Sequence, residues 1–240
     1  MDNYLELPFG ASSYQVQPSK VICLGLNYRE HVAESVSIRI AKQKPEIPSE
    51  PVLFPKLPSC IVGPNQAIEL PSILERYDFP EERTDYEGEV ALIVGRGGAR
   101  IPPEQALDHV LGITAANDVT QRNIQTTDRS GWFRGKSFDT FLPLGPRIVP
   151  LDSFDDLTAI SVTTRVNGEQ RQHGAIGDLI FPFEQIVSYI SHNFRLEAGD
   201  VILTGTPAGV GPIHHGDTVE VEVSGVGVLQ NPVHDARVGT

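Results

Sequence analysis

Residues 83–95 read RTDYEGEVALIVG, and two carboxylates stand at the start of the apolar run in this stretch. The unbroken apolar residues 90–94 predict a buried strand. Side chains alternate between the two faces of a strand, so Glu87 and Glu89 project from one face and the glycine between them from the other. Carboxylates this close repel each other unless a cation lies between them, which predicts a divalent-cation site with hard oxygen ligands, favouring Mg²⁺, Ca²⁺ or Mn²⁺ over Zn²⁺. The alternative is a solvated strand end in which Arg83 pairs with one carboxylate.

Composition and charge limit the classes of protein to be considered. The 240 residues are 40% hydrophobic and 21% charged, which suits one domain with a substantial core. The formal net charge of −12 argues against nucleic acid and anionic membrane surfaces as partners, and no apolar run is long enough to span a bilayer. Cys23 and Cys60 lie in apolar contexts without a CxxC pattern, which predicts buried free thiols in a reducing cytosol and a cytoplasmic protein.

Many short strands and few helices are expected along the chain. Asn167-Gly168 suits a type I′ turn, so residues 160–174 predict a hairpin. Residues 102–112 predict a short helix that begins at its prolines and stops at Gly112, and apolar residues at helical spacing predict another in 181–193. Further strand signals lie in residues 20–28, 51–64, 199–207 and 216–233. A mostly β chain of the α+β class, with two or three helices, predicts a closed or folded-over sheet.

Residues 27–34, NYREHVAE, place a histidine and a glutamate three positions apart. If this stretch is helical, His31 and Glu34 share a face and can hydrogen-bond. A carboxylate that holds one imidazole nitrogen leaves the other poised as a base. The alternative is an exposed polar turn of helix. The polar, proline-marked segments 37–50 and 75–84 are too long for tight turns, so each either covers an active site or is a plain surface loop.

Two further segments add candidate residues for chemistry. Asp118 follows an apolar, strand-like run and is either a third metal ligand or a turn residue. The same segment supplies Arg122 and Gln125. Lys136 lies among aromatic residues, where it either extends its ammonium group to solvent or meets an anionic substrate in a dry site.

The chain resembles the fumarylacetoacetate hydrolase family in the order and spacing of six segments. They are NYREHVAE, DYEGEVALIVG, AANDVTQRNIQ, RGKSFDTFLPLGP, VNGEQRQ and GDVILTGTPAGVGP. The similarity covers residues 20–233 and is to the short, single-domain bacterial type. It implies a catalytic domain over residues 20–240 after a short N-terminal segment, residues 1–19. The implied fold is a mixed β-sandwich or β-roll with a few short helices, and the implied assembly is a homodimer.

The resemblance also implies roles for nine residues of this sequence. They are Glu87, Glu89 and Asp118 as ligands of Mg²⁺ or Mn²⁺ (with Ca²⁺ as a substitute in crystals), His31 and Glu34 as a catalytic dyad on a lid of about residues 31–50, Lys136 as a catalytic lysine, and Arg122, Gln125 and Thr206 as substrate contacts. One departure from the family pattern is visible. Asn123 stands where many members carry aspartate, which removes a charge beside Arg122 and bears on substrate preference.

These expectations converge on small 2-oxo acids as substrates. A 2-oxo acid chelates the cation through its carboxylate and oxo oxygens, and the cation stabilises the enolate that forms when a bond to C3 breaks. The first hypothesis is a hydrolase that cleaves a C–C bond of an acylpyruvate or fumarylpyruvate, with His31 activating water, Glu34 orienting the imidazole and Lys136 stabilising the oxyanion. The alternative is an isomerase or decarboxylase of 2-hydroxyhepta-2,4-diene-1,7-dioate or oxaloacetate-like acids. A metal-binding protein without turnover explains the carboxylates but leaves the dyad and the lysine unexplained.

Overall fold

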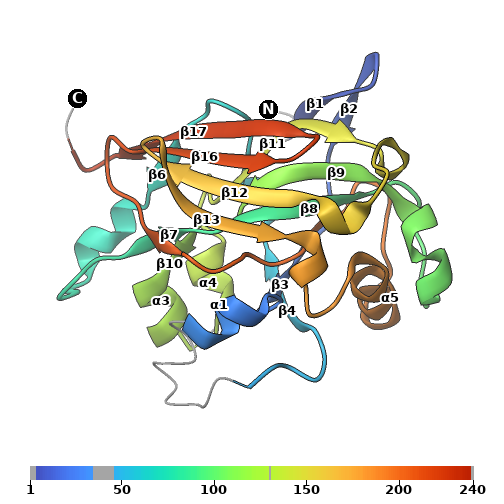
Figure 1. Ribbon diagram of the computed structural model, residues 1–240. Helices are drawn as coiled ribbons and strands as arrows, with labels where there is room; N and C mark the ends of the chain where they lie inside the picture. Colours follow the sequence, from blue (N-terminus) through green and yellow to red (C-terminus); the bar gives the residue numbers. More distant parts are fainter. Residues whose placement is uncertain (1–3, 35–45, 130, 239–240) are drawn as a thin grey trace.

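The apolar run of residues 90–94 lies near the centre of the longest sheet. The computed structural model describes residues 4–34, 46–129 and 131–238 (Figure 1). The run forms β8 (Gly88–Val94), in which every residue is buried. Its neighbours β9 (Val110–Asn117) and β14 (Val201–Leu203) both pair with it in antiparallel fashion. A strand paired on both edges and covered on both faces requires apolar side chains along most of its length, as residues 90–94 have.

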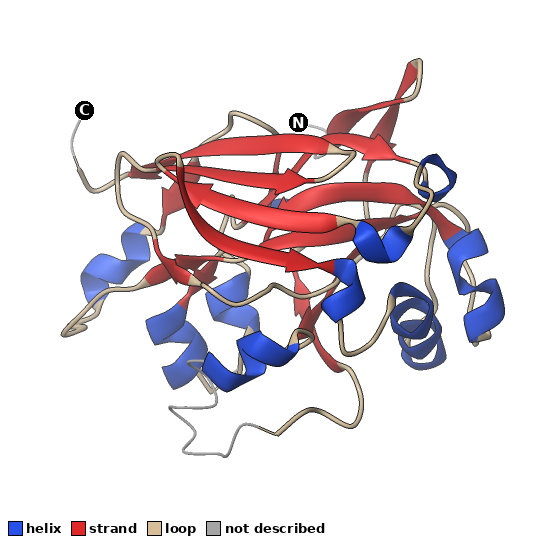
Figure 2. Cartoon of the chain, in the orientation of Figure 1, coloured by secondary structure: helices blue, strands red, loops and turns tan. Residues whose placement is uncertain are grey.

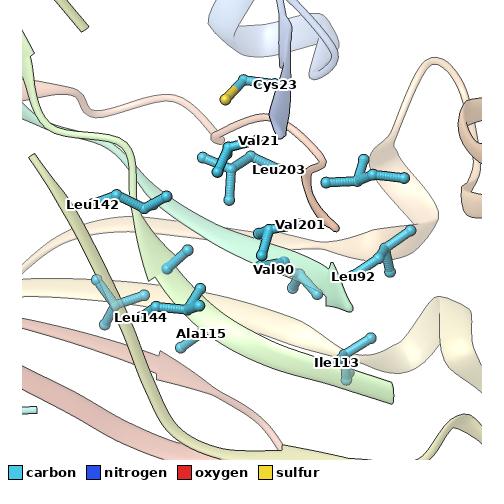
Figure 3. Close-up of a cluster of buried hydrophobic side chains, with 14 of the residues drawn as sticks. Val21, Cys23, Val90, Leu92, Ile113, Ala115, Leu142, Leu144, Val201 and Leu203 are labelled. Atoms are coloured by element: carbon cyan, nitrogen blue, oxygen red, sulfur yellow. The ribbon is translucent and has the colours of Figure 1, made fainter. Parts of the chain in front are cut away.

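The sheet around β8 contains nine strands and extends on both sides of it. The spatial order is β2 (Ser12–Val16), β1 (Leu5–Phe9), β11 (Leu142–Val149), β9, β8, β14, β3 (Val21–Gly25) and β4 (Val52–Lys56), with β5 (Ile61–Val62) pairing with β11. Figure 3 shows buried side chains from β3, β8, β9, β11 and β14 gathered into one apolar cluster. Most of the hydrophobic stabilisation of the fold comes from clusters of this kind.

A second sheet packs against the first and makes the fold a two-layer sandwich. It contains β13 (Glu169–Ala175), β12 (Ser161–Val166), β16 (Thr218–Val223), β17 (Gly227–Asp235) and β6 (Ile68–Leu70), while a small third sheet contains β10 (Thr120–Gln121), β7 (Thr84–Tyr86) and β15 (Gly211–Pro212). Figure 1 shows the second sheet lying across β8 and β9. A Cβ at Gly88 would lie 2.0 Å from Thr164 Oγ1 in β12, so the glycine allows the two sheets to approach.

Short helices lie around the margins of the sandwich (Figure 2). The α-helices are α1 (Arg29–Glu34), α3 (Arg122–Thr127), α4 (Phe133–Lys136) and α5 (Phe183–Asn193), and the 3₁₀ helices are Pro58–Cys60, Ser72–Arg76, Pro103–His109, Leu151–Ser153, Leu157–Ala159 and Ile176–Asp178. The helix expected in residues 181–193 is confirmed as α5, whose apolar side chains are buried. α3 and α4 pack against each other beside the end of β8 that carries the glutamates.

The hairpin prediction is confirmed, and one helix prediction is wrong in extent. Asn167 and Gly168 have φ angles of 54° and 79° and connect β12 to β13, as a type I′ turn requires. The expected helix over 102–112 is a 3₁₀ helix that ends at His109, and β9 begins at the next residue. Gly112 therefore does not stop a helix. A Cβ there would lie 2.5 Å from Val149 O in β11, so this glycine allows two strands to approach closely.

The fold class is confirmed as mostly β with a few short helices. Cys23 and Cys60 are buried and free, as expected. Residues 5–16 form a hairpin that joins the long sheet through a parallel bridge between β1 and β11. Within the described segments, no helix combines the length and apolar character that crossing a bilayer would demand.

Candidate active site

Three carboxylates meet at one end of β8. Glu87, Glu89 and Asp118 each offer an oxygen, and these oxygens lie within 4.8 Å of one another. All three residues are buried, and none is more than 4% exposed. The expectation that Glu87 and Glu89 converge from one face is confirmed. The solvated strand end is wrong for this strand, and Arg83 pairs with Asp85 instead, with 2.8 Å between Nε and Oδ1.

The register between β8 and β9 brings the third carboxylate to the pair. Gly88 lies opposite Asn117, and one position further the backbone N–H of Asp118 donates to the carbonyl of Glu87 at 2.8 Å. Opposed residues of an antiparallel pair project from the same face, so the Asp118 side chain lies beside that of Glu87. The amide oxygen of Asn117 also accepts a hydrogen bond from Glu87 N at 2.9 Å, which fixes the end of the strand.

The carboxylates belong to a continuous chain of ion pairs in which cations and carboxylates alternate. The members in order are Arg83, Asp85, Arg122, Glu87, Lys136, Asp118 and Lys56. Lys136 Nζ lies 2.6 Å from both Glu87 Oε2 and Asp118 Oδ2. Lys56 Nζ lies 2.7 Å from Asp118 Oδ1 and also donates to the carbonyl of Val119 at 3.1 Å. Buried charges persist only when they are paired in this way.

Each carboxylate of the cluster also has one oxygen that accepts from a donor not shared with the other two carboxylates. These donors are Arg122 for Glu87 Oε1, Lys56 for Asp118 Oδ1 at 2.7 Å, and the backbone N–H of Gly205 for Glu89 Oε2 at 2.6 Å. Such a partner fixes the orientation of a carboxylate. The other oxygens of Glu87 and Asp118 share the ammonium group of Lys136.

Glu87 and Glu89 experience opposite electrostatic environments. Burial disfavours the charged form of Glu87, but Lys136, Arg122 and His31 outweigh it and hold the pKa of Glu87 well below its usual range. Burial, followed by the charges of the two other carboxylates, raises the pKa of Glu89 well above its usual range. Of the three carboxylates, Glu89 is the one that forms no ion pair among the described residues.

The donor set fits a hard divalent cation. Carboxylate oxygens are the ligands that Mg²⁺ and Mn²⁺ prefer, and neither sulfur nor imidazole is among them here. The raised pKa of Glu89 agrees with this fit, because a cation would remove the repulsion that raises it. Across residues 4–34, 46–129 and 131–238, this is the one group of three or more histidine, cysteine, aspartate or glutamate side chains close enough to share an ion.

The helix α1 carries the expected base toward the cluster. Residues 29–34 are helical, which meets the condition under which His31 and Glu34 share a face. The imidazole of His31 lies near enough to Glu87 to help lower the pKa of that carboxyl group. The side chain of Glu34 and residues 35–45 of the expected lid lie outside the described residues, so the dyad and the lid stay predictions.

Arg122 and Gln125, which are expected to contact substrate, bond to other residues of the protein. Asn123, which departs from the family pattern, also forms hydrogen bonds within the protein. Arg122 pairs with two carboxylates of the chain, and its Nη1 donates to Gln125 Oε1 at 3.0 Å. Asn123 donates to the carbonyl of Glu81 and accepts from Arg83 N, each at 2.8 Å. The first of these bonds needs the amide N–H, which an aspartate lacks. The contacts of Arg122 and Gln125 with substrate stay predictions.

Gln172 in β13 was missed from the sequence and ties the second sheet to the site. Its Oε1 accepts from Gly88 N at 3.0 Å, and its Nε2 lies 2.8 Å from both Thr206 Oγ1 and the carbonyl of Pro207. The Thr206 hydroxyl in turn donates to the carbonyl of Gly88 at 2.8 Å. Both side chains therefore hold the backbone between the two glutamates, and the expected contact of Thr206 with substrate stays a prediction.

Lys56 was also missed, although the sequence contains a signal for it. Phe54 and Lys56 are two positions apart in β4, so their side chains share one face, and both are buried. Pro55 between them is exposed. A lysine that alternates with a buried aromatic residue indicates an ammonium group directed into the protein, where it requires an acidic partner.

A polar cleft of about 300 Å³ opens beside the start of α1. Its lining includes Tyr28, Arg29, Glu30, His173, Asp178 and Pro207. The Tyr28 hydroxyl is buried and has no hydrogen-bond partner in the part of the chain that the structure describes. Burial, then the charges of Glu89 and Asp178, raises the pKa of Tyr28 above its usual range.

Comparison with known families and proteins gives consistent matches. The family model described as "Fumarylacetoacetate (FAA) hydrolase C-terminal" matches residues 20–234. "Oxaloacetate tautomerase YisK" of Bacillus subtilis is 38% identical over 225 residues, covering 90% of this chain and 70% of the relative.

Two solved structures extend the comparison to the fold. A 5-carboxymethyl-2-hydroxymuconate delta-isomerase from Mycobacterium smegmatis is 38% identical with a TM-score of 0.78, covering 94% of this chain and 82% of its own. A fumarylpyruvate hydrolase from Pseudomonas aeruginosa, in complex with Mn²⁺ and pyruvate, is 30% identical with a TM-score of 0.83, covering 98% of this chain and 97% of its own. These similar proteins share one fold and differ in the reactions that their names state.

Proposed function

Because the chain belongs to the fumarylacetoacetate hydrolase family, we propose that it is a metal-dependent enzyme acting on 2-oxo acids. The observation that carries the proposal is the buried cluster of Glu87, Glu89 and Asp118, with Lys136 between two of them. Apolar side chains commonly stabilise a core as well as buried ion pairs do, so a cluster of this size points to chemistry rather than stability.

Under this proposal, Glu87, Glu89 and Asp118 hold Mg²⁺ or Mn²⁺. When bound, the cation supplies an electrophile for the carboxylate and oxo groups of the substrate and stabilises negative charge on the oxo oxygen. Lys136 offers its ammonium group to a developing oxyanion, and His31 takes or delivers the proton. The cleft beside Tyr28 receives the part of the substrate beyond C3.

We propose C–C hydrolysis of an acylpyruvate or fumarylpyruvate as the first reaction to test. It is supported by the fumarylpyruvate hydrolase from Pseudomonas aeruginosa, which matches this chain over nearly the full length of both. The second candidate is proton transfer in oxaloacetate or a hydroxymuconate-type acid, supported by the 38% identity to a tautomerase and to an isomerase. Decarboxylation of an oxaloacetate-like acid uses the same stabilised enolate.

Product analysis separates these reactions. The protein, saturated with Mg²⁺ or Mn²⁺, is assayed on fumarylpyruvate, simple acylpyruvates, oxaloacetate and 2-hydroxyhepta-2,4-diene-1,7-dioate. Pyruvate with a second acid indicates hydrolysis, release of CO₂ indicates decarboxylation, and a product of unchanged mass indicates isomerisation. A wild-type protein that binds neither metal, or that turns over none of these acids, overturns the proposal.

The variant His31→Ala tests the division of roles between the cation and the imidazole. Loss of CO₂ needs a stabilised enolate but no activated water, whereas hydrolysis needs both. We expect His31→Ala to abolish acylpyruvate cleavage and to retain a much larger share of any decarboxylation. The measurement is kcat/KM for both reactions. An equal loss in the two reactions would show that His31 serves a step common to both.

A further inference from the structure

Lys56 is fully buried at the end of the edge strand β4, and neither the sequence motifs nor the proposed mechanism uses it. None of its side chain is accessible, and its Nζ lies 2.7 Å from Asp118 Oδ1 and 3.1 Å from the carbonyl of Val119. Burying a lysine ammonium is unfavourable unless close partners offset the loss of hydration. Lys136 pairs with the other oxygen of Asp118 and with Glu87, so Asp118 contacts two cations, one of which it shares with Glu87.

The charge of the site depends on this second cation. Four cations alternate with three carboxylates along the ion-pair chain, and Glu89 adds a fourth carboxylate beside it, so the charges cancel. A divalent cation in a neutral cluster leaves two positive charges. The enolate form of a 2-oxo acid has two negative charges, one on its carboxylate and one on the enolate oxygen. Without Lys56, the loaded site would have a single positive charge.

We infer that Lys56, through its contact with Asp118 Oδ1, supplies positive charge with which the metal-loaded site binds the dianionic enolate form of a 2-oxo acid. The inference rests on the proposed function, because it assumes that the cluster holds a divalent cation. It also identifies Lys56 as a specificity determinant, since charge matching favours dianionic over monoanionic ligands of the same shape.

The inference predicts effects of opposite sign on two binding reactions. Removing the Lys56 charge takes a repulsive neighbour away from the metal cation and an attractive neighbour away from the substrate anion. A lysine with only a structural role would behave differently, because its loss would disorder Asp118 and weaken both reactions together.

The experiment measures dissociation constants by isothermal titration calorimetry, first of Mn²⁺ and then of oxalate or oxamate with the Mn²⁺-loaded protein. Oxalate is a dianion, and oxamate is a monoanion of nearly the same shape. The variants are Lys56→Met, which lacks charge and donor, and Lys56→Gln, which keeps a donor without charge. Lys20→Met is the matched control, because Lys20 pairs with Asp200 outside the cluster.

For both neutral variants we expect Mn²⁺ affinity that is unchanged or up to about tenfold tighter, and oxalate affinity about tenfold weaker. Oxamate, with half the charge, should weaken only about threefold. Lys20→Met should match the wild type in all three measurements. Weaker binding of Mn²⁺ and oxalate together, or equal losses for oxalate and oxamate, overturns the inference.

The wild-type protein keeps the inference testable if neither variant folds. A loaded site with two positive charges must prefer oxalate to oxamate by at least about tenfold, and equal affinities overturn the assignment of Lys56. Failure of the proposed function gives a distinct result, since a wild-type protein that binds no Mn²⁺ contradicts the metal site itself.

Discussion

The two faces of β8 have opposite chemistry over the same few residues. Toward the second sheet, the strand presents Gly88 and then apolar side chains, and the glycine lies against Thr164 of β12. From the other face, Glu87 and Glu89 meet Lys136 and the other charged groups of the cluster. Every residue from 88 to 94 is buried, so the difference is one of partners rather than of exposure.

This comparison shows two ways in which a strand is held in place. An apolar face needs only neighbours of suitable volume, which any well-packed sheet supplies. A charged face needs particular partners at particular atoms, and here they come from β4, α3 and α4, which are distant in sequence. The apolar face therefore stabilises the fold, while the charged face supplies the chemistry.

The largest expected effect comes from removing the charge of Glu89 without changing its shape. Glu89→Gln should lower kcat/KM for any 2-oxo acid substrate by roughly 10³-fold, because the cation loses a ligand. The metal-free protein should be no less stable, since glutamine resembles the protonated carboxyl group that burial favours at this position. Steady-state kinetics with saturating Mg²⁺ and thermal unfolding in a chelator measure the two effects. Retained activity would remove Glu89 from the site.

The next largest expected effect is a loss of stability when the charged face loses one of its cations. Lys136→Met removes one cationic partner from Glu87 and one from Asp118. It should lower the free energy of unfolding by about 3–5 kcal/mol, because two buried carboxylates lose an ion pair. Arg165→Met is the control, since it breaks a partly exposed pair with Glu222 and should cost less than about 1 kcal/mol. Urea denaturation of the metal-free proteins provides both values. Equal losses would contradict the distinction between buried and surface pairs.

A smaller loss is expected when the apolar face is overpacked. Gly88→Ala should lower the free energy of unfolding by about 1–3 kcal/mol, because the new methyl group would meet Thr164 Oγ1. Adding Thr164→Ala should recover part of the loss, and on its own it should cost little, since this hydroxyl has no hydrogen-bond partner among the described residues. A double variant no more stable than Gly88→Ala would show that the sheets clash elsewhere.

The smallest effect is a pH dependence confined to the charged face. The folded metal-free protein keeps the proton of Glu89 to higher pH than the unfolded chain, whose value is near 4.5. Its free energy of unfolding should therefore fall as pH rises above 4.5 toward the raised pKa, by at most about 1.4 kcal/mol per pH unit. The lowered pKa of Glu87 acts in the other window, because its contribution is lost as pH falls below 4.5. Glu89→Gln should remove the slope above 4.5, and an unchanged slope would assign it to another group.

Much of the fold was predictable because it depends on local patterns. A few neighbouring residues were enough to predict three elements: the strand β8 from its apolar run, the turn from Asn167-Gly168, and α5 from its helical spacing. The helix expected over 102–112 ends at His109, because the residues that follow form β9 and pair with β8 and β11. The predicted homodimer and cytoplasmic location stay predictions.

The amino-acid sequence by itself determined which residues could form a cation site. The i, i+2 spacing of Glu87 and Glu89 fixes their common face whatever the rest of the chain does. The ordered motifs indicated Asp118 and Lys136 as companions. The departure at Asn123 was visible in the sequence as well, although its hydrogen bonds to Glu81 and Arg83 were not.

Only the tertiary structure decided how the charges of that site are balanced. Lys56 and Gln172 lie 62 residues before Asp118 and 84 residues after Gly88, and neither separation produces a local pattern. Their contacts arise because β4 and β13 belong to strands and sheets that pack around β8. Local spacing fixes which way a side chain points, whereas the packing of distant strands fixes what it meets, and in a buried site the partners set the charge.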